Sequence, residues 1–135
     1  MLVLSGCYSQ IALQDAERFS DADVCGQYGG RVEQFAVTGY PKPQTSFATG
    51  KPFDALVAEI KSRRLVRPEQ VDAVLRRQVA IGMTDIEALC TWGAPTTVTA
   101  VGAEEQWVYI PKYGPRPPND RSLTIASGYV TAINH

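Results

Sequence analysis

Apolar residues in the middle of the chain recur at the three- and four-residue spacing of a helix face. The first stripe predicts a helix whose first turn holds Pro52, a position where proline is tolerated, and its members are Phe53, Leu56, Val57 and Ile60. A second stripe follows Pro68 and consists of Val71, Val74, Leu75 and Val79. Only a few residues, Val66 and Arg67 among them, lie between the two patterns. We therefore expect a helical hairpin or a sharply bent pair of helices.

A third, shorter helix is predicted over residues 84–92, and both of its ends are marked. Thr84 and Glu87 have the T-x-x-E spacing of a capping box at the start. Gly93 suits a left-handed position after the last turn, and Pro95 prevents continuation. A helix this short is marginal by itself. It must pack on something else, and Ile86, Leu89 and Cys90 form its apolar face.

The pattern then changes to that of extended strands. Residues 96–101 are rich in β-branched side chains, and residues 105–110 alternate, with Trp107 and Tyr109 on one face. Residues 122–126 and 129–133 are two more strand-like runs, joined by a tight turn at Ser127 and Gly128. We expect the helix 84–92 to pack on the sheet near Trp107 or Val108. Trp107 is then a core anchor or a half-exposed aromatic that a partner covers.

The N-terminal third gives weaker signals. Residues 10–19 form a loose apolar stripe, and Ser20 is a candidate N-cap for a second short helix that Gly29 and Gly30 would end. Residues 36–52 are rich in Gly, Pro, Ser and Thr without a period, so we interpret them as a linker. The proline-rich residues 111–120 are predicted to be a loop, because prolines cannot serve a central strand.

Charge and composition exclude some classes of function. The 135 residues carry 13 Lys and Arg against 14 Asp and Glu, a net charge of -1, whereas general nucleic-acid binding needs a basic surface. The local basic run of Lys61, Arg63, Arg64 and Arg67, with Arg76 and Arg77 further on, is interpreted as a solvated helix face. No apolar run approaches the ~20 residues of a membrane-spanning helix.

The first residues resemble a lipoprotein processing site. Leu4, Ser5, Gly6 and Cys7 match the lipobox of bacterial lipoproteins, which implies cleavage before Cys7 and attachment of diacylglycerol to its thiol. No Lys or Arg precedes Cys7, so a signal peptide would have to start upstream of this numbering. Tyr8, rather than Asp, follows the Cys, and the resemblance then implies the outer membrane. The alternative is an apolar N-terminus with an incidental Cys.

The segments "GMTDIEALCTWGAP", "EQWVYI" and "SLTIASGYVTAINH" together resemble the BamE/SmpA/OmlA family of outer-membrane lipoproteins. The resemblance covers residues 70–135. It implies an α+β fold in which short helices pack on a three-stranded antiparallel β-meander, with an additional helical segment at the N-terminus. We expect a signal remnant over 1–7, a helical segment and linker over 8–52, and the helix-on-sheet domain over 53–135.

The family resemblance implies a non-catalytic accessory or scaffold subunit, anchored by lipid on the periplasmic face of the outer membrane. Its partners would be other envelope proteins of a barrel-assembly or secretion-system complex. The long proline loop is the predicted contact surface, with Tyr113, Pro115, Arg116 and the nearby Tyr129. A periplasmic inhibitor-like binding module and an envelope enzyme are the alternatives.

Catalytic and metal-binding patterns are missing from the sequence. The single histidine is the terminal His135, and no His, Cys or carboxylate residues show metal-ligand spacing, so no cofactor or metal is expected. If Cys7 is acylated, Cys25 and Cys90 remain, an even number in an oxidising compartment. They either form a disulfide that ties the N-terminal segment down, or Cys90 is a free thiol on an apolar face.

Overall fold

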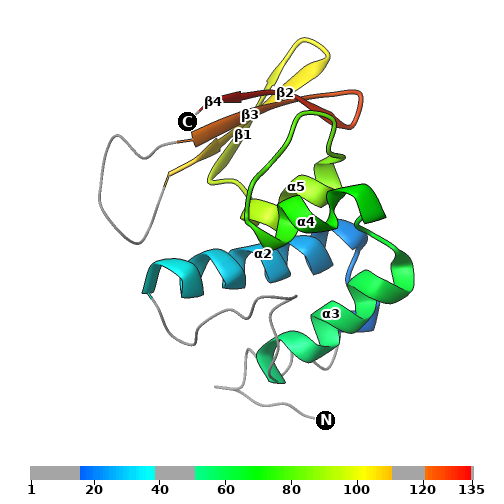
Figure 1. Ribbon diagram of the computed structural model, residues 1–135. Coiled ribbons are helices and arrows are strands. Elements are labelled where there is room, and N and C mark those ends of the chain that lie inside the picture. Colours follow the sequence, from blue (N-terminus) through cyan, green and yellow to red (C-terminus); the bar gives the residue numbers. More distant parts are fainter. Residues whose placement is uncertain (1–15, 39–50, 111–120, 135) are drawn as a thin grey trace.

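The computed structural model describes residues 16–38, 51–110 and 121–134, which form an α+β fold with a four-stranded antiparallel sheet (Figure 1). The helical elements are η1 (Ala16–Arg18), α2 (Asp21–Thr38), α3 (Lys51–Arg63), η2 (Pro68–Gln70), α4 (Val71–Leu75) and α5 (Asp85–Trp92). The strands are β1 (Thr97–Val101), β2 (Glu104–Tyr109), β3 (Arg121–Ala126) and β4 (Tyr129–Asn134). Cys7 and the proline loop lie outside the described residues.

The sheet is a meander in the order β1-β2-β3-β4, one strand more than the three that the family resemblance implies. The extra strand is β1, which pairs with β2 and places Val98 opposite Trp107. Positive φ angles shape both tight turns: +63° at Gly102 in the first, and +55° and +84° at Ser127 and Gly128 in the second. Positive φ at both central residues fits the right-handed twist of the strands, and the predicted second turn is confirmed.

One face of the sheet forms the β side of the core. Its buried side chains are Trp107, Tyr109, Leu123, Ile125 and Val130. The alternation predicted for β2 is confirmed, because the neighbouring Val108 is only half-buried and Ile110 is exposed. The Tyr109 hydroxyl donates to the Gly93 carbonyl at 2.8 Å, and the Trp92 ring meets the Tyr109 ring edge-on at 5.4 Å. Trp107 is therefore a core residue, and the C-terminal end of α5 is held on β2.

Helix α5 lies between α2 and the sheet (Figure 1). The prediction that α5 packs on the sheet was incomplete, since its most extensive contact is with α2. Backbone hydrogen bonds join the residues just before α5 to strand β4 of the sheet. The Gly82 amide donates to the Val130 carbonyl at 2.9 Å, and the Val130 amide donates to the Met83 carbonyl at 2.8 Å. The helices and sheet thus form three layers, and Met83 is completely buried among them.

Gly29 marks the crossing of α2 and α5, and the prediction that Gly29 and Gly30 end the second helix was wrong. Helix α2 continues through both glycines to Thr38. A Cβ atom at Gly29 would collide with the Leu89 carbonyl and come within 2.5 Å of the Gly93 nitrogen. Gly29 therefore permits a close approach of two helices rather than a helix end.

Two further boundaries differ from the sequence prediction. The predicted linker 36–52 is helical at both of its ends, and residues 39–50 lie outside the described residues. Helix α4 ends at Leu75 instead of reaching Val79. Arg77 has a φ of +58° there, and its amide bonds the Val74 carbonyl while the next amide bonds Ala73, which is the Schellman pattern.

The N-terminal elements share one core with the rest of the described chain. Buried residues from η1 and α2, such as Ala16 and Val24, belong to the same apolar cluster as Leu56 and Leu123. The guanidinium of Arg63 adds a polar tether, because it donates to the Phe19 carbonyl and to the Asp21 carboxylate at 2.8 and 2.9 Å. We expected a boundary between segments at residue 52. The described elements on the two sides of that position contribute to one buried core.

Candidate functional site

The capping box at the start of α5 places a carboxylate in the interior. The Glu87 amide donates to the Thr84 hydroxyl at 3.0 Å, and the Thr84 amide donates back to the Glu87 carboxylate at 2.9 Å. Both halves of the predicted box are confirmed. The Glu87 side chain has 0% exposure. A buried carboxylate needs a cationic partner as well as hydrogen bonds.

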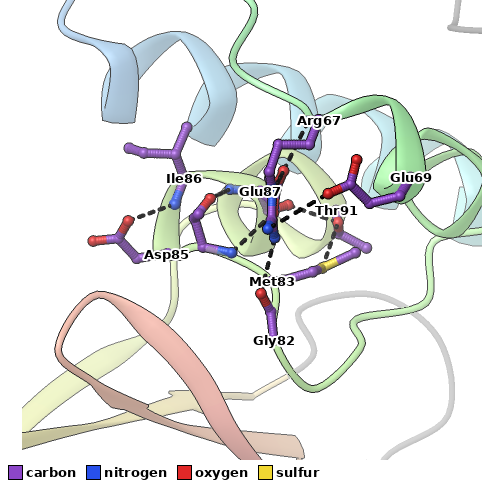
Figure 2. A network of polar contacts seen from close by, with 9 residues as sticks. Arg67, Glu69, Gly82, Met83, Asp85, Ile86, Glu87 and Thr91 are labelled. Carbon is purple, nitrogen blue, oxygen red and sulfur yellow. Dashed lines mark hydrogen bonds and ion pairs between the residues drawn. The ribbon is translucent and has the colours of Figure 1, made fainter.

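That partner is Arg67, from the turn between α3 and η2 (Figure 2). Its backbone amide and its Nε donate to one Glu87 oxygen at 2.8 and 2.9 Å, and Nη2 donates to the other at 2.7 Å. Nη2 also donates to the Gly82 carbonyl at 2.9 Å. Arg67 thus joins the α3–α4 turn to the start of α5. The prediction of a purely solvated basic face was wrong at this residue.

Both partners are held in their charged forms. Burial by itself would raise the pKa of Glu87, but hydrogen bonds from Arg67 and from the Thr84 amide outweigh it and keep the pKa below its ordinary value. The hydrogen bond to Glu87 raises the pKa of the Arg67 guanidinium, although partial desolvation acts against it. The pair has no sequence signature, because its members are 20 positions apart.

A groove of about 540 Å³ opens beside this ion pair. It is lined mainly by apolar surface, and its residues come from the end of α3, the following turn and the start of α4: Ile60, Lys61, Arg64, Val66, Arg67, Pro68 and Val71. The groove exists because α3 ends at Arg63, and the next residue, Arg64, has a φ of +54° that turns the chain back in a second Schellman pattern.

Two cations at the groove have no ion pair among the residues that the structure describes. Lys61 and Arg64 are exposed, and neither has an ion pair within the described residues. Arg63, by contrast, pairs with Asp21 and Glu59. Lys61 and Arg64 are the members of the predicted solvated run that line the groove and have no ion pair among the described residues. The arrangement offers an apolar trough next to two positive charges, which suits an apolar group flanked by carboxylates.

Some of the remaining predicted site residues lie outside the described part of the chain, and the others can be placed in the structure. Cys7, Tyr113, Pro115 and Arg116 lie outside the described residues. Tyr129 opens β4 with 47% exposure and bridges to Thr84 through its backbone. The sulfurs of Cys25 and Cys90 are bonded to one another, and their Cα atoms are 4.1 Å apart.

Within the described part of the chain, no helix is long and apolar enough to cross a membrane. The same residues include no group of three or more His, Cys, Asp or Glu side chains that could hold a metal ion. Comparison with protein-family models, with curated proteins and with solved structures gives no match. The resemblance to the BamE family therefore rests on the sequence motifs alone.

Proposed function

We propose that this protein is a lipid-anchored, non-catalytic accessory subunit that binds another protein in the bacterial cell envelope. The observation that carries the proposal is the disulfide between Cys25 and Cys90. Structural disulfides persist in oxidising compartments such as the periplasm and are rare in the cytosol. The lipobox-like residues before Cys7 agree with such a location, since lipoproteins are modified outside the cytosol.

The groove at the end of α3 supports a binding role. Its apolar lining and its two available cations, Lys61 and Arg64, complement an acidic, amphipathic segment of a partner protein. The BamE-like motifs of residues 82–133 favour a partner in a barrel-assembly or secretion-system complex at the outer membrane. The loop 111–120 stays a second candidate surface, so the two surfaces need separate tests.

Membrane fractionation tests the anchor. Cells that express the intact gene should incorporate labelled palmitate into the protein, which should sediment with outer membranes. Cys7→Ser should lose the label and appear in the soluble periplasmic fraction. A Cys7→Ser protein that stays entirely with the membranes contradicts the anchor. An unmodified wild-type N-terminus in mass spectrometry would instead favour the soluble inhibitor-like module.

Crosslinking and co-isolation from membranes test the groove. Arg64→Glu reverses one available cation and should reduce recovery of the crosslinked partner several-fold, because the groove charge contributes to partner recognition. Arg76→Glu is the matched control: Arg76 is also exposed, but it pairs with Asp72 on α4, outside the groove. Equal recovery with both variants would exclude the groove and direct attention to the loop 111–120.

A further inference from the structure

Backbone groups around the groove at the end of α3 are already hydrogen-bonded within the protein. At the last turn of α3, the Ile60 carbonyl accepts the Leu65 amide at 3.1 Å, and the Lys61 carbonyl accepts the next-but-two amide at 3.2 Å. In the following turn, the Arg67 amide donates to Glu87 and the Arg67 carbonyl accepts another backbone amide, both at 2.8 Å. These backbone groups are therefore satisfied without a bound segment.

The remaining lining of the groove adds little hydrogen-bonding capacity. Val66 and Val71 contribute apolar side chains, and Pro68 has no amide hydrogen. An extended segment buried in such a groove would leave its own N–H and C=O groups unpaired, which is unfavourable. A helix pairs these groups internally and can bury an apolar face without that cost. The groove therefore favours a helical occupant over an extended one.

Positive and negative charges lie on different sides of the groove. Lys61 is in the last turn of α3 and Arg64 directly follows the helix, three positions later, so the two cations are about one helical turn apart. On the other side, η2 and α4 carry the exposed acidic residues Glu69 and Asp72. An occupant is therefore favoured when its negative charges face α3 and its uncharged side faces α4.

We propose that the groove binds an amphipathic helix of the partner protein, whose apolar face covers the aliphatic lining and whose acidic residues, one turn apart, face Lys61 and Arg64. This inference rests on the proposed function, because it takes the groove as the surface that binds a partner. The helix has apolar residues at three- and four-residue spacing, with the acidic residues along one side of that stripe. A volume of about 540 Å³ is enough to receive side chains of such a face.

Photocrosslinking in cells tests the helical form of the occupant. The amino acid p-benzoylphenylalanine replaces Val66 or Val71 in the full chain, and mass spectrometry identifies the partner residues attached after irradiation. We expect attached positions three or four residues apart, with acidic residues beside them, because one face of a helix has this period. The same amino acid in place of Arg76, which is exposed and outside the groove, is the control and should not attach to this segment.

The crosslinking pattern separates this inference from the proposed function. Attached protein positions that alternate by two residues would overturn the helix but leave a protein partner at the groove. A lipid attached at both groove positions, or no protein attached at either, would overturn the helix together with the groove as a protein-binding surface. Equal attachment from the Arg76 position would have the same consequence.

Charge exchange tests how the helix is oriented. A synthetic peptide with the crosslinked sequence is titrated with the full chain, and binding is followed by fluorescence anisotropy. Lys61→Glu together with Arg64→Glu should weaken binding several-fold, whereas Arg76→Glu should not. Lysine in place of the acidic residues of the peptide should restore binding to the doubly substituted chain, which a misfolded variant cannot do. Equal binding by wild type and the double variant, or no restoration, would overturn the proposal.

Discussion

Glu87 has no exposed surface, so its ionisation couples the stability of the fold to pH. Its pKa is lower in the folded chain than the ordinary value of 4.5. The ionised Glu87 therefore contributes its full stabilisation at pH values above its ordinary pKa. This contribution is lost as the pH falls through the lower pKa that Glu87 has in the folded chain. The free energy of unfolding, measured by urea denaturation, should fall as pH is lowered below about 4.5.

Glu87→Gln should remove this part of the pH dependence. The amide group would present a donor to the donors of Arg67 and Thr84, so we expect a loss of about 2 kcal/mol at pH 7 and a smaller loss at pH 3. Glu69→Gln is the control, because Glu69 contacts the same arginine at 3.7 Å from an exposed position. Equal effects of the two substitutions would contradict the importance of the buried pair.

At the scale of elements, the crossing of α2 and α5 leaves no room for a Cβ atom at Gly29 of α2, whereas the neighbouring Gly30 has room for one. A Cβ atom at Gly29 would collide with the backbone of Leu89 and Gly93, whereas a Cβ atom at Gly30 would have no atom within 4 Å. Gly29→Ala should therefore force the helices apart and lower the free energy of unfolding by about 3 kcal/mol. Gly30→Ala should raise it by about 0.5–1 kcal/mol, because alanine favours a helix interior.

Thermal or chemical denaturation of the two alanine variants measures both effects on the same background. The expected result is a change of opposite sign for adjacent residues. If Gly29→Ala stabilises the protein as Gly30→Ala does, the close contact of α2 with α5 is wrong.

At the scale of the whole molecule, the disulfide connects the first described helices to the later part of the core. The bonded cysteines are 65 positions apart, and a closed loop of this length stabilises by about 4 kcal/mol in the chain-entropy view. Cys25→Ala together with Cys90→Ala should lower the denaturation midpoint strongly. Protection of α2 amides against hydrogen exchange should fall more than that of β3 amides.

Non-reducing peptide mapping of periplasmic protein checks the bond directly, with a single crosslinked peptide as the expected result. Two thiols that alkylate without reduction would contradict it. The hydrogen bonds of Arg63 to η1 and α2 would then still connect these segments.

Features that depend on near neighbours in the chain could be predicted from the sequence. Thr84 and Glu87 cap α5, Ser20 accepts the Asp23 amide at 3.1 Å, and Gly128 occupies a positive-φ turn. In each case the interacting groups are at most three residues apart, so the local sequence determines the geometry. The ends of α3 and α4 could not be predicted, because the Schellman turns that follow them place Arg64 and Arg77 at the positive-φ position where glycine is the usual signal.

The sequence by itself therefore determined the strands, the turns and the start of α5, whereas only the tertiary structure decided which elements meet. The role of Gly29 depends on α5, far along the chain, and the buried pair of Arg67 and Glu87 depends on how the α3–α4 turn faces that helix. The same holds for the groove that leaves Lys61 and Arg64 available. Local propensity acts over a few residues, but burial and charge pairing are properties of surfaces that only packing brings together.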